Sequence, residues 1–115
     1  MTQPTIDHAT FDELKETAGA EFVSELVDTF LAEAPVMVAD LRDSLAAGDA
    51  DRFRRAAHSL KSNSNTFGAL TLGALAKNLE LTGLAPAAAA NGATLDVLAT
   101  EYARVASALT ELTRG

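Results

Sequence analysis

The sequence predicts an all-α domain that folds as an antiparallel up-down four-helix bundle with a short additional helix at its N-terminus. Of the 115 residues, 48% are hydrophobic but only 5% are aromatic, so Leu, Val and Ala must build most of the core. Ala and Leu are strong helix formers. Apolar residues recur at steps of three and four, the period of a helix. Short connections between long helices favour antiparallel neighbours, and this length suits one domain, expected to span residues 1–115.

A short helix is expected first, over residues 11–17. Thr10 and Glu13 have the spacing of a capping box, in which a hydroxyl and a carboxylate satisfy free N–H groups at a helix start. Gly19 then breaks the pattern before the next element begins.

A long helix follows, over roughly residues 20–47. Pro35 lies within it, and because the apolar period resumes beyond this residue, we expect the proline to bend the helix rather than end it. Gly48 supplies the stop. The apolar face of this helix comprises Val23, Val27, Phe30, Ala34, Met37, Leu41 and Leu45.

The third helix is expected over about residues 50–67, with Asp49 or Asp51 as its N-terminal cap and Gly68 at its end. Its core-facing stripe determines which of its other residues point to solvent. That stripe comprises Phe53, Ala57, Leu60 and Phe67, with the small Ser64 completing it.

The fourth helix should begin near Leu70, and its apolar pattern could extend as far as Leu84. An alanine run at residues 87–90 could then belong to either neighbouring helix. The last helix has the clearest pattern, with steps of three and four that are typical of a bundle seam. Its seam comprises Leu95, Leu98, Tyr102, Val105, Leu109 and Leu112.

Composition excludes several classes of function. The net charge of -7 argues against nucleic acid, which requires clustered basic residues. The absence of cysteine excludes disulfides and thiolate metal sites. The sequence has neither a signal peptide pattern nor an apolar run of membrane-spanning length. We therefore expect a cytoplasmic protein without contact to a membrane. A monomer is expected as well, although the sequence itself does not say whether the chain dimerises.

His58 is predicted to point away from the core. At about 100° per residue, Phe53, Leu60 and Phe67 lie roughly 140–180° around the helix from it. The other face, within about 60° of His58, comprises Arg54, Arg55, Lys61, Ser62 and Asn65.

An isolated histidine is often a satisfied core residue, but the helical geometry places this ring outside. The interpretation of His58 as an incidental surface histidine without a role remains open. A metal site has little support, because His8 is the only other histidine and no His or carboxylate follows His58 at a spacing of three or four.

Arg52, Arg54, Arg55 and Lys61 bring four of the nine basic residues close to His58. Such a run is often only a solvated face, but here it surrounds a side chain that can act as a nucleophile. Cations beside an exposed imidazole favour the approach of an anionic group. They also favour the neutral ring, whose lone pair can attack phosphorus.

Residues 58–69, HSLKSNSNTFGA, resemble the His-x-Leu-Lys-Gly signature, with a later Gly, of histidine phosphotransfer (HPt) domains. Ala57, Leu79-Glu80 and the opening from Ile6 to Gly19 are also similar to that family, so the resemblance covers nearly the whole chain. It implies a four-helix bundle with an exposed phosphoacceptor histidine midway along one helix, used in two-component signalling.

The resemblance assigns roles to individual residues. His58 matches the phosphoacceptor, and Lys61 matches the lysine that neutralises the phosphoryl oxygens. Glu80 falls where members of the family carry a polar side chain that can orient the imidazole. Ser62 stands where the family usually has Gly, which gives the incoming aspartyl phosphate room. This departure concerns the transfer rate or the choice of partner more than the role itself.

The mechanism implied is reversible transfer between His58 and receiver-domain aspartates, with Lys61 and either Arg54 or Arg55 supplying positive charge. The partners would be response-regulator receivers, which would supply the magnesium, and a hybrid sensor kinase could be another. We expect a phosphocarrier rather than an enzyme, with no cofactor of its own, because there is no nucleotide-binding loop for autophosphorylation from ATP.

Two other functions compete with this one. A non-catalytic helical interaction module with a degenerate or unused His58 would look similar, and Ser62 keeps that alternative open. A small hydrolase that uses His58 as a base is less well supported, since no suitable Ser, Cys or Asp arrangement accompanies it. The sequence leaves open whether the chain is free-standing or part of a longer kinase.

Overall fold

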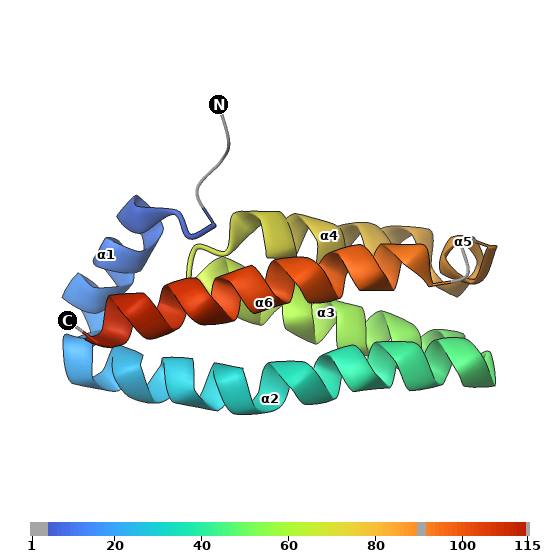
Figure 1. Ribbon diagram of the computed structural model, residues 1–115, viewed down its shortest axis with the longest axis horizontal. Coiled ribbons are helices and arrows are strands. Elements are labelled where there is room, and N and C mark those ends of the chain that lie inside the picture. Colours follow the sequence, from blue (N-terminus) through green and yellow to red (C-terminus); the bar gives the residue numbers. More distant parts are fainter. Residues whose placement is uncertain (1–4, 90–91, 115) are drawn as a thin grey trace.

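The computed structural model describes residues 5–89 and 92–114, and in these ranges the chain is helical, without a strand. Four of the helices are long and lie side by side along the longest axis of the molecule, while α1 (His8–Ala18) crosses one end of them and α5 (Leu84–Ala89) lies at the other end (Figure 1). The all-α helical bundle predicted from the sequence is thus confirmed. The helices are α1 (His8–Ala18), α2 (Ala20–Ala47), α3 (Ala50–Thr66), α4 (Leu70–Thr82), α5 (Leu84–Ala89) and α6 (Ala93–Arg114).

The predicted start of α1 was wrong. The helix begins at His8, and its cap is Asp7, whose carboxylate accepts hydrogen bonds from both the backbone N–H and the hydroxyl of Thr10. Thr10 therefore lies in the first turn and is not itself the cap. The flanking Ile6 and Phe11 are both buried, at the positions where a hydrophobic staple fixes the entry of the chain into a helix.

The predicted bounds of α2 are confirmed, and the helix continues through the exposed Pro35. Gly48 ends it in the left-handed conformation (φ +71°), and its N–H donates to Ser44 and Leu45 carbonyl oxygens. This left-handed geometry is the reason that glycine suits the position. Asp49 then caps α3, accepting from the N–H of Arg52.

The region after α4 differs from the expectation. The fourth helix ends at Thr82, with Gly83 (φ +79°) as its C-terminal cap, so Leu84 does not extend it. Leu84 instead begins α5, a separate six-residue helix that takes up most of the alanine run. Position 90, the end of that run, lies outside the described residues.

The core lies between the four long helices and is mostly aliphatic, as the composition required. Three of the aromatic side chains contact one another, and the ring of Phe30 lies 5.3 Å from that of Phe67 and 6.0 Å from that of Tyr102. The predicted core-facing stripe of α3 is buried, although the helix ends at Thr66, so Phe67 is its C-terminal cap and not its last residue. The stripe comprises Phe53, Ala57, Leu60, Ser64 and Phe67. Because this face of α3 is buried, the opposite face of the helix points to solvent.

Within the described part of the chain, no helix is both long and apolar enough to cross a membrane.

Candidate functional site

His58 stands midway along α3, on the face opposite the core. Its side chain is 58% exposed, while its neighbours Ala57 and Leu60 are fully buried. The prediction that the ring points to solvent is therefore confirmed, and the alternative of a buried core histidine is excluded.

Glu80 of α4 lies directly against the ring. Its Oε2 is 2.7 Å from His58 Nδ1, and its Oε1 is 2.7 Å from Lys61 Nζ. The two helices form a hairpin through the connection at Gly68 and Ala69, which brings together residues 22 and 19 positions apart in the chain. The carboxylate therefore joins the histidine and the lysine into one group.

The position of Glu80 has an electrostatic consequence. The hydrogen bond from Lys61, supported by that from His58, lowers the pKa of the Glu80 carboxyl below its usual value, although partial burial opposes the shift. Glu80 is consequently ionised at neutral pH and can only accept hydrogen bonds. The short contact therefore assigns a proton to His58 Nδ1.

The second ring nitrogen remains accessible for chemistry. Within residues 5–89 and 92–114, no hydrogen bond to His58 Nε2 is formed. In the neutral ring with its proton on Nδ1, Nε2 carries the lone pair. The lone pair of such a ring thus lies on the nitrogen that has no hydrogen-bond partner among the described residues.

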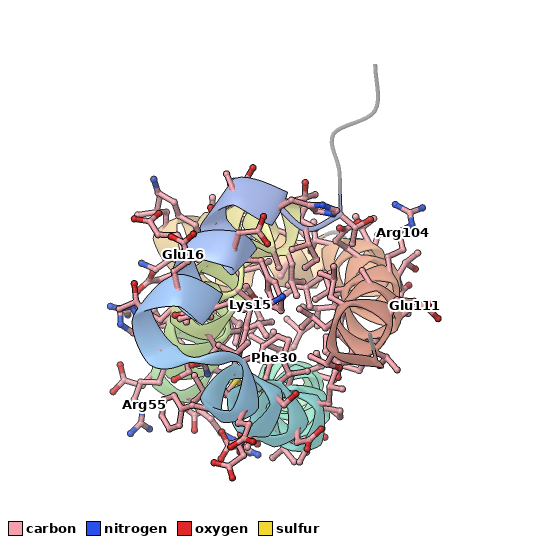
Figure 2. The ribbon with its side chains drawn as sticks, turned by 90° about the vertical axis from the view of Figure 1, so that its left-hand side faces the viewer. Lys15, Glu16, Phe30, Arg55, Arg104 and Glu111 are labelled. Carbon is pink, nitrogen blue, oxygen red and sulfur yellow. The ribbon has the colours of Figure 1, made fainter. Side chains whose placement is uncertain are left out.

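The cations predicted around His58 separate into three groups. Arg54 and Arg55 are exposed and line an open hollow of about 370 Å³ beside His58, which Asp51, Ser59 and Glu80 also line. Figure 2 shows Arg55 at the outer edge of the bundle. The guanidinium of Arg54 lies 4.0 Å from Asp51, at the limit of an ion pair.

Lys61 is less available than the sequence suggested, because its ammonium is paired with Glu80 and its side chain is only 25% exposed. Arg52 does not belong to the site. It turns toward α2, where it lies 2.6 Å from Asp40 and 3.8 Å from Asp43. The charges next to the imidazole are thus those of Lys61 and Glu80, which offset each other. Arg54 and Arg55 line the hollow beside this pair.

Ser62 lies on the outer face of α3, one turn from His58, and is exposed. Its carbonyl oxygen accepts from the hydroxyl of Thr66 at 3.0 Å, while its own hydroxyl has no partner among the described residues. A hydroxyl in this position is free to meet a group that approaches His58.

The sequence did not reveal which apolar residues remain exposed. Phe22, which could have served the core or an interface, is exposed, whereas Leu26 and Leu31 pack partly against the core. Leu81, which directly follows Glu80, is 74% exposed and was not predicted to be so. The sequence of α4 did indicate such exposure, because the helix is apolar on most sides and a surface helix of that kind must expose part of its apolar surface.

Comparisons with known proteins agree with this geometry. The Hpt domain family model matches residues 25–108, a stretch that contains His58, Lys61 and Glu80. Among solved structures, the chain is similar to histidine-containing phosphotransfer protein B (HptB) from Pseudomonas aeruginosa PAO1. The two share 28% identity with a TM-score of 0.82, over 98% of this chain and 97% of that one. The comparison with curated proteins found no match. Because the family model covers well over half of the chain, this protein belongs to the Hpt domain family, the histidine phosphotransfer modules of two-component signalling.

Proposed function

We propose that the chain carries a phosphoryl group on Nε2 of His58 and exchanges it with receiver-domain aspartates. The observation that supports this most directly is the 2.7 Å contact between His58 Nδ1 and the Glu80 carboxylate on an otherwise exposed ring. It holds the ring in one orientation and directs the lone pair outward.

In the proposed reaction, the Nε2 lone pair attacks the phosphorus of a receiver aspartyl phosphate in line with the bond that breaks. The N–P bond forms while the O–P bond breaks, and its electron pair returns to the aspartate carboxylate. The reverse step loads a second receiver. Because the transition state is loose, positioning and neutralisation of charge contribute most of the catalysis.

Lys61 and the arginines of the hollow would supply that neutralisation. Lys61 lies one turn from His58 and can turn from Glu80 toward a phosphoryl oxygen. Arg54 and Arg55 line the open side of the same hollow, where an anion would enter. The hydroxyl of Ser62 could donate one further hydrogen bond.

The partners we propose are response-regulator receivers, with a hybrid sensor kinase as a further donor. The receiver would supply the acidic cluster and the magnesium ion, so this chain would act as a phosphocarrier without a cofactor of its own. We further propose that it works as a monomer in the cytoplasm.

A transfer assay tests this proposal. The purified chain is incubated with a phosphorylated receiver, and the protein is examined for an acid-labile, base-stable label. We expect label on the wild type and on His8→Gln, which removes the other, exposed histidine, and none on His58→Gln. Failure of the wild type to label with several receivers would contradict the carrier role and favour a simple interaction module. Label that persists in His58→Gln would place the acceptor elsewhere.

A further inference from the structure

The Glu80 carboxylate has an unusual position for a group next to a phosphorylation site. One of its oxygens contacts His58 Nδ1 and the other contacts Lys61 Nζ, and its side chain is only 19% exposed. A neutral amide could orient an imidazole equally well by a hydrogen bond. The negative charge of Glu80 is not needed to orient the ring, and it would repel the negative phosphoryl group that approaches. We therefore asked what this charge contributes.

We propose that Glu80 keeps the proton on Nδ1 of His58 while the ring is phosphorylated, so that the ring departs as neutral imidazole when the phosphoryl group is passed on. The inference rests on the proposed role of His58. Glu80 acts here as a positioning residue, since it touches the ring and not the phosphoryl group.

The bond changes show why this proton matters. When the Nε2 lone pair forms the N–P bond, a ring that retains its Nδ1 proton becomes a phosphorylated imidazolium with one positive charge. When the N–P bond breaks in the next transfer, the electron pair returns to Nε2 and neutral imidazole remains. If Nδ1 had lost its proton in between, the leaving group would be the imidazolate anion, which is a much poorer one. No proton needs to move in either step as long as Nδ1 stays protonated.

The surroundings of Glu80 favour the protonated ring. A hydrogen bond between an ionised carboxylate and a cationic ring is roughly twice as strong as one between neutral groups. The low pKa of Glu80, held down by Lys61 and then by His58, keeps the carboxylate charged and unable to donate over the working pH range. Replacement by an amide would remove that preference for the charged ring.

The other charges near this pair come mainly from α3. Lys61 partly offsets Glu80, and the hollow beside the ring adds Asp51, Arg54 and Arg55. The short helix α5 brings no titratable side chain, because residues 84–89 are Leu, Ala and Pro. The charges of α6 that approach α4 belong to a different hollow, which comprises Thr71, Leu75, Asp96, Val97, Thr100, Glu101 and Arg104.

The test compares Glu80→Gln with the wild type and with Glu16→Gln, which removes an exposed charge on α1. Each protein is phosphorylated by a charged receiver, isolated, and mixed with unphosphorylated receiver between about pH 6 and 9, and the rate of phosphoryl loss is measured. Dividing each rate by that of the wild type at the same pH removes the pH dependence of the receiver. For Glu80→Gln we expect a ratio within about threefold of one at the acidic end, falling by up to about tenfold per pH unit at the alkaline end. Glu16→Gln should give a constant ratio near one.

A second measurement keeps the result interpretable. The ¹⁵N resonances of the phosphorylated ring report directly whether Nδ1 carries a proton, and we expect the wild type to retain it to higher pH than Glu80→Gln. A constant rate ratio across the pH range, or equal ¹⁵N titrations in the two proteins, would overturn the inference. These outcomes require a wild type that accepts label, so they are distinct from failure of the phosphocarrier role, in which no label appears at all.

Discussion

The side-chain amide of Asn65 occupies the space that a Cβ atom on Gly73 would need. A methyl group placed on Gly73 would lie 2.1 Å from Asn65 Oδ1. Asn65 stands seven residues beyond His58 on α3, and Gly73 stands seven residues before Glu80 on α4, so the two pairs are two turns apart on the same helix hairpin. The close contact between Asn65 and Gly73 thus occurs in the same register of α3 against α4 that brings Glu80 to His58.

Substitution of Gly73 by Ala should have an effect that depends on Asn65. Alanine improves helix propensity by about 1 kcal/mol, but here it must displace the Asn65 amide, which is exposed and can turn to solvent. We expect Gly73→Ala to change the free energy of unfolding by less than about 1 kcal/mol in the wild type and to stabilise more clearly in an Asn65→Ala background. Denaturant unfolding of the four proteins of this cycle measures the coupling. Strictly additive effects would show that the two side chains do not compete for this space.

Replacement of Lys61 by Ala should slow transfer without unfolding the bundle. The lysine is paired with Glu80 near the surface, so its loss should lower the free energy of unfolding by at most about 1 kcal/mol. Loss of one charge that stabilises the transition state should reduce the transfer rate by about ten- to a hundredfold. Lys77→Ala, at an exposed position on α4, serves as the matched control and should transfer normally. An unfolded Lys61→Ala protein would contradict the placement of this side chain on the solvent face.

The direction of His58 could be predicted from the sequence because it depends only on the period of one helix. The burial of Phe53 and Leu60 on the opposite face follows from the same count. The contact with Glu80 could not be obtained in that way, since it depends on the register between two helices. The register is set by the turn at Gly68, whose carbonyl oxygen also accepts from the N–H of Asp7 at 2.7 Å.

Spacing along the chain did not by itself locate the cap of α1 or the cations that lie beside His58. Thr10 fits a cap by spacing, but Asp7 is a better acceptor three residues earlier, and Ile6 reaches the core only from that start. Arg52 lies close to His58 in the sequence, but the separation of six positions turns it about 120° around the helix from the histidine, and there it pairs with Asp40 of α2.

Leu81 should contribute to partner docking because it is 74% exposed and directly follows Glu80. Covering an exposed apolar side chain with a partner removes its surface from water, which favours binding. We expect Leu81→Ala to weaken receiver binding by about three- to tenfold while leaving the free energy of unfolding within about 0.5 kcal/mol. Val97, which is 57% exposed on α6, provides the control, and Val97→Ala should leave binding unchanged. Titration of each variant with a receiver, together with thermal unfolding, measures both effects. Equal weakening by the two substitutions would argue against a docking face centred on His58.

Ser62 allows the effect of space next to the acceptor to be separated from the effect of its hydroxyl. Ser62→Gly removes both the Cβ atom and the hydroxyl, whereas Ser62→Ala removes the hydroxyl alone. If the side chain narrows the approach of the aspartyl phosphate, the glycine variant should transfer several-fold faster than the wild type, roughly three- to tenfold, and the alanine variant should transfer at about the wild-type rate. If the hydroxyl instead stabilises the phosphoryl oxygens, both variants should slow by a similar factor.

Glycine within α3 should also lower the free energy of unfolding by about 0.5 kcal/mol, and Ser107→Gly, at an exposed position on α6, controls for that loss. Single-turnover transfer from a labelled receiver distinguishes the two outcomes, and unchanged rates in both variants would show that neither the space nor the hydroxyl at this position limits the reaction.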